Sequence, residues 1–445
     1  MSGIYDFLKL LVHRRFSSKS NIEAYQFTEL KSLVEFARSN SEFYRESLHG
    51  FELNEIGDIK KLPIINKNIM MSHFDQINTV GLTLDEVMAV AVEKEHNKDY
   101  LGYYKDEFVI GLSSGTSGNK GLYITPKSLT ERLPFVFLAR SGIPLRYLSF
   151  KILFMLRVFS QGFNDINSPL ISLKYLSTMT PVDEIIRHIN QGKINVLMAP
   201  PSLCRILIPV AHRITKPLKM IVTYAEVLEK EEKTRLSDVF QCRIIEIYQG
   251  SEGQFASACS LGNLHINEDL IYVELLDEQF SEVKNPHVAA SHIIVTNLVN
   301  RAQPLIRYEM NDLIVLDDPC PCGSRFRTIE KILGRNDDIL YFKKKDGSIQ
   351  HIFPDLFSRW IITSSENIRE YKVIQQSDHS LIVLLDPIVS REQSELIESV
   401  RIRLNTELSP YDIECLMDIR CEAIALPANR AKYKRFEVAK DIIKS

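Results

Sequence analysis

The sequence predicts an α/β protein with a large N-terminal domain, whose mostly parallel sheets are flanked by helices and accompanied by a β-rich subdomain, and a small C-terminal α+β domain. Three observations predict this. The chain has 445 residues, which is too long for one compact core. Helix-like and strand-like segments alternate through its middle. A glycine and charged residues at 334–338 then separate two segments of different pattern.

The composition is that of an ordinary globular protein, with 45% hydrophobic and 25% charged residues. A net charge of -3 gives no reason to expect nucleic-acid binding through charge. The cysteines are seven, an odd number, and they are scattered through the chain. This favours a reduced, cytoplasmic protein over a disulfide scaffold.

The first sixteen residues, MSGIYDFLKLLVHRRF, are apolar with interruptions at Asp6 and Lys9. No small-residue cleavage site follows them, so we do not expect a signal peptide. No apolar run approaches the length that spans a bilayer. The basic residues beside leucine and phenylalanine suit a membrane surface. An amphipathic helix packed on the main domain is the interpretation we favour.

Helical spacing runs from about Asn21 to Glu46, and Leu62–Lys67 is typical of a turn into another helix. The chain then alternates: a helix at Leu129–Arg140, a strand at Phe150–Leu156, a helix at Pro181–Gln191, strands at Asn195–Met198 and Met220–Tyr224, a helix at Glu229–Phe240 and a strand at Arg243–Tyr248. Such alternation predicts crossover connections and a largely parallel sheet.

Beyond about Leu270 the pattern changes to β-type runs, which predict a small antiparallel or barrel-like subdomain. After 334–338 the sequence predicts a small α+β domain of ordinary size. Its expected elements are a helix at Pro354–Thr363, strands at Tyr371–Gln375 and Leu381–Leu385, a helix at Arg391–Glu407 and a strand near Ile413–Ile419.

The segment Val109–Pro126, VIGLSSGTSGNKGLYITP, places glycines and small hydroxyl residues between two strand-like runs. Glycine lets backbone amides turn inward, and hydroxyls with a lysine complete a set of donors suited to polyphosphate. The candidate phosphate-binding residues are Ser113, Ser114, Gly115, Thr116, Ser117, Gly118 and Lys120. The spacings of the P-loop and of the dinucleotide fingerprint are both absent. An ordinary serine- and glycine-rich hairpin loop is the alternative.

Four further motifs follow this loop in fixed order: YQGSEG at 248–253, PLIRYEMNDL at 304–313, LGRNDDIL at 333–340 and AKYKRFEV at 431–438. The ordered set resembles the adenylate-forming superfamily of acyl-CoA synthetases and adenylation domains, in particular phenylacetate–CoA ligase and its capsule-biosynthesis relatives. The resemblance extends over nearly the whole chain. It implies an adenylation domain at 1–333, a hinge at 334–338 and a small mobile lid domain at 339–445.

In YQGSEG the resemblance implies that Tyr248 lies against adenine, because an aromatic face suits stacking. It implies a nucleotide-binding place for Gly250 as well. Ser251 stands where the family usually has threonine, and the resemblance gives it a bond to the α-phosphate. Glu252 matches the carboxylate that coordinates Mg²⁺, a hard ligand for a hard ion. Taken alone, the segment is typical of a strand that ends in a glycine turn.

The resemblance also implies roles for three residues before and within the hinge. Asp312 matches the aspartate that binds both ribose hydroxyls, for which a carboxylate has two acceptor oxygens. Arg335 matches an arginine near the ribose or phosphates, and Asp337 matches the residue about which the lid rotates. A turn aspartate and a solvated run of charges are the alternatives.

Lys432 matches the mobile lysine that contacts the forming adenylate, although Ala431 replaces the usual glycine and Lys434 lies close by. A solvated basic tail is the alternative. The glycine loop also departs from the family, because it is one residue shorter before Lys120.

Cys259, His265, Cys320 and Cys322 form a separate candidate group. Three thiols and an imidazole suit tetrahedral zinc. The resemblance to the phenylacetate-ligase branch also implies a structural zinc ion, because some members of that branch share this cysteine pattern. Free thiols are the alternative.

The resemblance therefore implies an enzyme that uses ATP and Mg²⁺ to convert a carboxylic acid, favoured to be an aryl or arylacetic acid, into an acyl-AMP. A thiol, in the first place coenzyme A, would then accept the acyl group. Transfer to a carrier protein, an amine or a hydroxyl remains open. So do a non-catalytic nucleotide-binding protein and a phosphotransferase that would release ADP. The sequence predicts neither the identity of the acid nor the oligomeric state. A homodimer is one alternative for the latter.

Overall fold

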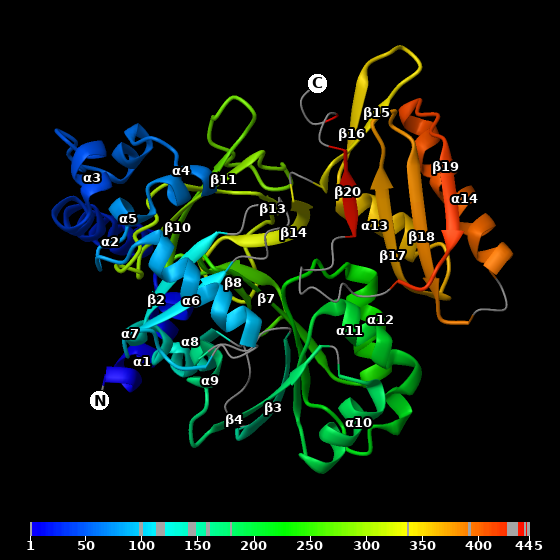
Figure 1. Cartoon of the computed structure of the whole chain (residues 1–445), viewed down its shortest axis with the longest axis horizontal. Coiled ribbons are helices and arrows are strands. Elements are labelled where there is room, and N and C mark those ends of the chain that lie inside the picture. The colour runs from blue at the N-terminus through cyan, green and yellow to red at the C-terminus, as the bar shows by residue number, and fades with distance from the viewer. Residues whose placement is uncertain are drawn as a thin grey trace. The chain divides into compact units, whose positions relative to one another are not determined.

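The structure is a computed structural model, and it describes residues 2–97, 101–112, 121–140, 148–156, 161–178, 180–335, 338–389, 393–424, 435–439 and 442. The described residues group into two compact units. The first is formed mainly by the chain up to Lys331. The second is formed mainly by the chain from Ile332 onward, together with Asn311–Ile314. Figure 1 shows the elements of both, and the predicted α/β class is confirmed.

The helices are α1 (Ser2–Phe16), α2 (Lys19–Asn40), α3 (Glu42–Ser47), α4 (Lys67–Ser72), α5 (Phe74–Ile77), α6 (Leu84–Asn97), α7 (Lys127–Thr130), α8 (Leu133–Arg140), α9 (Gln161–Asn164), α10 (Val182–Gln191), α11 (Pro201–Leu207), α12 (Lys230–Phe240), α13 (Pro354–Ile362) and α14 (Gln393–Leu408). The strands are β1 (Phe108–Leu112), β2 (Leu122–Pro126), β3 (Phe150–Leu156), β4 (Ile171–Ser177), β5 (Val196–Met198), β6 (Met220–Thr223), β7 (Arg243–Gly250), β8 (Gly253–Ala258), β9 (Leu264–Ile266), β10 (Ile271–Leu276), β11 (His292–Asn297), β12 (Tyr308–Met310), β13 (Asp312–Leu316), β14 (Thr328–Arg335), β15 (Leu340–Lys343), β16 (Ile349–Ile352), β17 (Ile368–Gln375), β18 (Leu381–Pro387), β19 (Met417–Cys421) and β20 (Phe436–Val438).

The largest sheet has nine strands in the order β13-β14-β9-β8-β7-β6-β5-β3-β4, and the strands from β9 to β4 belong to the first unit. The strands from β4 to β7 pair in parallel, and β8 then pairs antiparallel with β7. Helices α10, α11 and α12 gather on one side of the parallel strands (Figure 1). Leu153 and Met155 of β3 pack toward these helices, while Ile152 and Phe154 pack with Phe137 of α8 on the opposite face. Both faces are therefore buried, as parallel strands require.

Most predicted elements of the first unit are confirmed: α10, α12, β3, β5, β6 and β7 lie within a residue or two of the expected bounds. The helical character predicted from about Asn21 to Glu46 is confirmed, but it is divided between two helices. Ser41 breaks it into α2 and α3, because the Ser41 hydroxyl accepts a hydrogen bond from the Tyr44 amide (3.3 Å) and caps the second helix. The helix predicted at Leu129–Arg140 is likewise two short helices, α7 and α8.

The β-rich part of the first unit includes a three-stranded antiparallel sheet, β10-β11-β12. Its predicted strand character is confirmed. A buried ion pair fixes the loop before β12: Arg307 donates to both carboxylate oxygens of Glu274 on β10, at 2.9 Å each. Such a two-point contact sets the direction of the guanidinium as well as its position. The loop therefore presents β12 in a fixed orientation.

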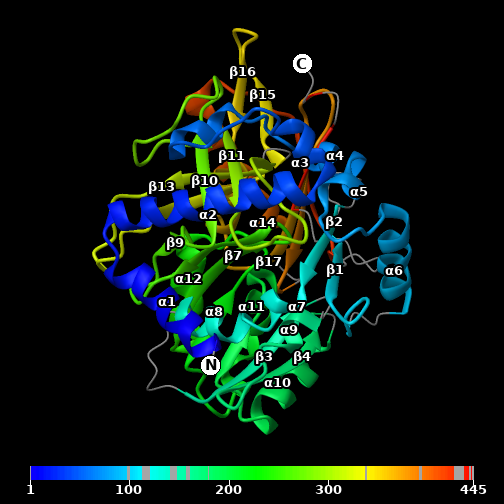
Figure 2. The same cartoon turned by 90° about the vertical axis from the view of Figure 1, so that its left-hand side faces the viewer.

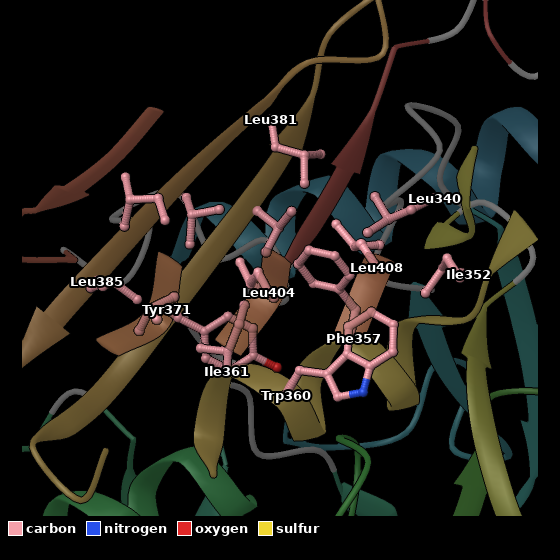
Figure 3. Close-up of a cluster of buried hydrophobic side chains, with 14 of the residues drawn as sticks. Leu340, Ile352, Phe357, Trp360, Ile361, Tyr371, Leu381, Leu385, Leu404 and Leu408 are labelled. Atoms are coloured by element: carbon pink, nitrogen blue, oxygen red, sulfur yellow. The ribbon is translucent and has the colours of Figure 1, made fainter. Parts of the chain in front are cut away.

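The second unit holds a four-stranded sheet of order β19-β18-β17-β20 and a hairpin, β15-β16. Helices α13 and α14 supply Phe357, Trp360, Leu404 and Leu408 to one buried cluster with the sheet residue Tyr371 (Figure 3). The predicted α+β character is confirmed. The last predicted strand, near Ile413–Ile419, is displaced toward the C-terminus, since β19 begins at Met417.

The N-terminal helix α1 packs on α8, in agreement with the prediction for this segment. Arg14 donates to the Ser257 carbonyl on β8 (2.9 Å), and Arg140 of α8 donates to the Leu10 carbonyl (2.9 Å). Arg140 also pairs with the buried carboxylate of Asp269, which His13 contacts at 3.2 Å. Charged groups that are out of water need such partners, so this network holds α1 in place.

Replacement of Asp269 by asparagine is expected to lower the thermal midpoint of the protein by roughly 6 °C, the equivalent of about 3 kcal/mol, because it leaves Arg140 and Arg14 buried without a counter-charge. Calorimetry of the variant measures this, with the exposed Asp238→Asn as the control. An unchanged midpoint for Asp269→Asn would contradict the structural role of the network.

The same carboxylate predicts a pH dependence. Burial alone would raise the pKa of Asp269, but the Arg140 guanidinium outweighs it and lowers the pKa below the usual 3.8. A depressed pKa means that the stabilisation is complete above about pH 4 and is lost as the pH falls further. The difference in thermal midpoint between wild type and Asp269→Asn should therefore narrow between pH 6 and pH 3. A constant difference over that range would contradict it.

Candidate nucleotide and metal sites

The predicted phosphate loop lies between β1 and β2, which pair antiparallel with Leu112 opposite Leu122. The strands that flank the loop are thus confirmed. The loop residues themselves, Ser113 to Lys120, lie outside the described residues, as do Asp337 and Lys432. Arg335 is the last residue of β14. Their predicted roles remain predictions.

The motif YQGSEG forms the tight hairpin between β7 and β8. Gly250 pairs with Gly253, so that Ser251 and Glu252 stand at the tip of the turn. The carboxylate of Glu252 folds back over Gly250: a Cβ at position 250 would lie 2.5 Å from Glu252 Oε2 and 3.1 Å from Phe255. Glycine is therefore what allows this carboxylate position. The backbone of this segment is therefore a strand that ends in a glycine turn, as the alternative interpretation of the motif predicted.

Glu252 is linked to two tyrosines from other motifs. The hydroxyl of Tyr123, on β2 just after the glycine loop, donates to Glu252 Oε1 at 2.8 Å. It also lies 3.1 Å from the hydroxyl of Tyr308, in the PLIRYEMNDL motif. Burial and the nearby Glu252 carboxylate raise the pKa of Tyr123, so its phenol stays protonated and donates to the carboxylate. Burial also raises the pKa of Tyr308.

This chain of three side chains brings the strand behind the glycine loop, the YQGSEG turn and the start of PLIRYEMNDL into one place. Asn297 also supports the turn, since its side-chain amide donates to the Glu252 carbonyl at 2.7 Å. Tyr123, Tyr308 and Asn297 are not among the site residues predicted from the sequence. The signal for the tyrosines was present, because each lies inside or beside a motif, but nothing in one sequence pairs them.

Two other predicted nucleotide residues are described. Tyr248 is half-buried near the end of β7, with its ring 5.1 Å from that of Phe255 in a tilted arrangement. Asp312 is the first residue of β13 and is half-exposed. Asp312 groups with the second unit, and Tyr248 with the first.

The carboxyl ends of β5, β6 and β7 lie at one edge of the sheet, because these strands are parallel. Ligands of open α/β sheets bind at this edge. Ala225, just after β6, has a φ of +68°. A residue with a Cβ adopts this left-handed backbone conformation only at an energetic cost. The next residue, Glu226, accepts hydrogen bonds from the amide (2.9 Å) and hydroxyl (2.7 Å) of Ser202 after β5.

The four predicted metal ligands come together. Cys259, His265, Cys320 and Cys322 each offer one ligand atom, and these atoms all lie within 4.8 Å of one another. The Cys259 and Cys320 sulfurs are 3.9 Å apart, and Cys322 Sγ is 3.5 Å from His265 Nε2. The order β14-β9-β8 explains the meeting, because His265 on β9 lies between the strand that leads to Cys259 and the strand that follows the two other cysteines.

The chemistry of this group fits zinc. His265 Nδ1 lies 2.9 Å from the Phe326 carbonyl, which fixes its proton there and leaves Nε2 free to coordinate. Burial lowers the pKa of His265 to about 4, so the ring is neutral at pH 7. The Leu261 amide and the Asn263 side chain donate to Cys259 and Cys320, at 3.3 Å and 3.2 Å. Such donors stabilise thiolates, which are the ligand form of cysteine.

The fold is that of adenylate-forming ligases, and comparisons with known proteins find the chain similar to members of that superfamily, in agreement with the resemblance stated from the motifs. No family model matches the chain.

The similar curated proteins include protein CapK of Staphylococcus aureus, 21% identical over 403 residues, which are 85% of this chain and 81% of that protein. Phenylacetate-coenzyme A ligase of Thermus thermophilus is 27% identical over 118 residues, only 26% of this chain and 25% of that enzyme. Among solved structures, 2-hydroxyisobutyryl-CoA ligase in complex with R3-HIB-AMP superposes with a TM-score of 0.73 at 14% identity, covering 97% of this chain and 92% of that one. Anthranilate CoA ligase AuaEII with anthranoyl-AMP gives a TM-score of 0.53 at 12% identity, covering 74% and 66%.

Proposed function

We propose that this chain is an ATP-dependent ligase that joins a carboxylic acid to AMP, releases pyrophosphate and then transfers the acyl group to a thiol, in the first place coenzyme A, with release of AMP. The observation that carries the proposal is the hydrogen-bonded chain Glu252–Tyr123–Tyr308, in which the Tyr123 hydroxyl joins side chains from three of the five motifs. The structural likeness to ligases solved with acyl-AMP supports it.

In the proposed first step a carboxylate oxygen of the acid bonds to the α-phosphorus of ATP, and the bond from that phosphorus to the pyrophosphate oxygen breaks. Charge develops on phosphate oxygens, so the protein contributes position and neutralisation. The loop Ser113–Lys120 holds the leaving phosphates. Ser251 donates to the α-phosphate, Tyr248 stacks on adenine and Asp312 accepts the ribose hydroxyls. The hydroxyl of Tyr123 holds the Glu252 carboxylate in place meanwhile.

Glu252 fits a magnesium ligand, because a half-buried carboxylate stands over a glycine that leaves it room. Mg²⁺ is usually held by one or two carboxylates together with substrate phosphates. When bound, it would neutralise charge on those phosphates. We also propose a structural zinc ion at Cys259, His265, Cys320 and Cys322, where it would tie β8 and β9 to the segment that leads into β14.

The acid is proposed to be an aryl or arylacetic acid, from the phenylacetate-ligase branch of the resemblance. Acid-dependent exchange of labelled pyrophosphate into ATP tests the first step, over a panel that includes phenylacetate, benzoate, anthranilate and 2-hydroxyisobutyrate. Exchange with at least one acid supports the enzyme. ATP binding without exchange for any acid overturns it in favour of a non-catalytic nucleotide-binding protein, and ADP as product overturns it in favour of a phosphotransferase. Coenzyme A is then added with the acid that supports exchange. Formation of the acyl-CoA thioester identifies coenzyme A as the acceptor, rather than a carrier protein, an amine or a hydroxyl.

The mobile lysine is proposed to be Lys432. Its replacement by alanine should lower the rate of pyrophosphate exchange about a hundredfold, because the ammonium would no longer neutralise charge on the forming adenylate. Lys434→Ala is the matched control and should keep the rate within about threefold. A reversed pair of results would move the role to Lys434. Full exchange in both variants would contradict the assignment of the lysine to this tail.

A further inference from the structure

The N-terminal helix α1 has two faces of different character. One face is anchored to the first unit: Leu10 is buried with Ala139 and Leu270, and Phe7 and Leu11 pack against the same cluster. Arg14 adds its two hydrogen bonds to Ser257 on this side. The helix therefore needs no rearrangement to keep its opposite face available.

The opposite face carries a stripe of large apolar side chains: Tyr5, Leu8, Val12 and Phe16, with exposed fractions of 68%, 53%, 49% and 77%. Spacings of three and four residues place these side chains along one line of a helix. Figure 2 shows α1 at the edge of the first unit, where it leads into α2. The stripe is therefore continuous and accessible, whereas a core-facing helix would bury such residues.

The charges beside this apolar stripe are positive. Lys9 lies at one edge of the stripe, with its ammonium 4.8 Å from the Tyr25 ring centre, and Arg15 is exposed at the other edge. The acidic residue of α1, Asp6, is turned aside: its side chain is 18% exposed and pairs with Arg132 at 3.0 Å. The face thus joins apolar contact to positive charge.

This combination fits one partner best. A surface of anionic lipid offers an apolar layer for the stripe and negative headgroups for Lys9 and Arg15, whose long side chains can extend to them. Among the described residues, no helix is long and apolar enough to cross a membrane. A second copy of this chain would instead set like charges against each other across the stripe.

We propose that α1 docks flat on anionic lipid membranes through Tyr5, Leu8, Val12 and Phe16, with Lys9 and Arg15 contacting the headgroups. The docking is independent of the nucleotide site, because none of these side chains belongs to it.

Flotation of the full chain with lipid vesicles tests the proposal. Wild type should bind vesicles of phosphatidylcholine with about one third phosphatidylglycerol at least about tenfold more tightly than phosphatidylcholine alone, and salt should weaken that binding. Leu8→Gln/Phe16→Gln should lose about tenfold or more of the binding, and Lys9→Gln/Arg15→Gln should lose the preference for anionic vesicles. The control Leu170→Gln/Leu416→Gln changes two exposed leucines elsewhere and should bind like wild type.

No binding to anionic vesicles overturns the proposal, as does equal binding to both vesicle types or an equal loss in the control. A dimer in lipid-free sedimentation that Leu8→Gln/Phe16→Gln dissociates also overturns it, in favour of a second copy as the occupant. The rate of pyrophosphate exchange in solution should be the same for wild type and for both α1 variants. Failure of vesicle binding is thereby distinguished from failure of the proposed enzyme.

Discussion

Replacement of Glu252 by glutamine is expected to lower the rate of acid-dependent pyrophosphate exchange roughly a thousandfold, with the fold intact. Glutamine keeps the size of the side chain and can still accept from Tyr123 through its amide oxygen. It removes the charge, and with it a hard anionic ligand for Mg²⁺. The effect should therefore fall on the rate rather than on stability. Initial rates at saturating ATP and acid, beside calorimetry of both proteins, measure the two.

The Tyr123→Phe variant provides a graded test of the same site. It keeps the ring on β2 and removes only the hydroxyl that holds Glu252, so the rate should fall about tenfold, far less than in Glu252→Gln. Tyr272→Phe is the matched control, because Tyr272 is half-buried on β10 outside this hydrogen-bonded chain, and it should leave the rate unchanged. Near-normal exchange in Glu252→Gln would contradict the role of the carboxylate. An equal loss in Tyr272→Phe would show that the assay reports general damage.

The fold class and the parallel strands were predictable because each core strand is a short run of apolar residues bounded by a turn. The strand β3 is an example, and its observed bounds equal the predicted ones. Its neighbour β4 was missed. That strand lies at the end of the sheet and carries alternating exposed residues such as Lys174, so its apolar signal is diluted. The break between α2 and α3 was missed for a local reason, since the single hydroxyl of Ser41 decides it.

The candidate sites divide in the same way. The residues of the YQGSEG turn were predictable because a turn is local and its motif is contiguous. The bond between Tyr123 and Glu252 joins residues 129 positions apart, so no window of sequence contains both partners. The cysteine and histidine group lies between these cases. Its residue types suggested a metal, but only the pairing of β9 between β8 and β14 brings His265 to the cysteines.

Purified protein is expected to contain about one equivalent of zinc, and removal of the ion or of one ligand should destabilise the first unit strongly. Cys320→Ser leaves three donors, too few for the four-coordinate structural site. The free energy of binding a structural zinc ion contributes to the free energy of folding. We therefore expect Cys320→Ser to lower the free energy of unfolding by roughly 5 kcal/mol and the thermal midpoint by about 10 °C. Elemental analysis and calorimetry, with and without a chelator, measure these. The damage should reach the nucleotide site, because β8 pairs with β7 directly beside the Glu252 turn.

The control for this experiment is Cys242→Ser, a half-buried cysteine of the same unit outside the metal group. This variant should keep the full equivalent of zinc, and its thermal midpoint should equal that of wild type, because it loses no metal ligand. Less than about half an equivalent in wild type, or a full equivalent in Cys320→Ser, would contradict the zinc site. Both variants remove one thiol. If the thermal midpoint falls only in Cys320→Ser, the lost stability is due to zinc coordination and not to the packing of a sulfur atom. Restoration of the midpoint by added zinc in chelated wild type, but not in Cys320→Ser, would complete that assignment.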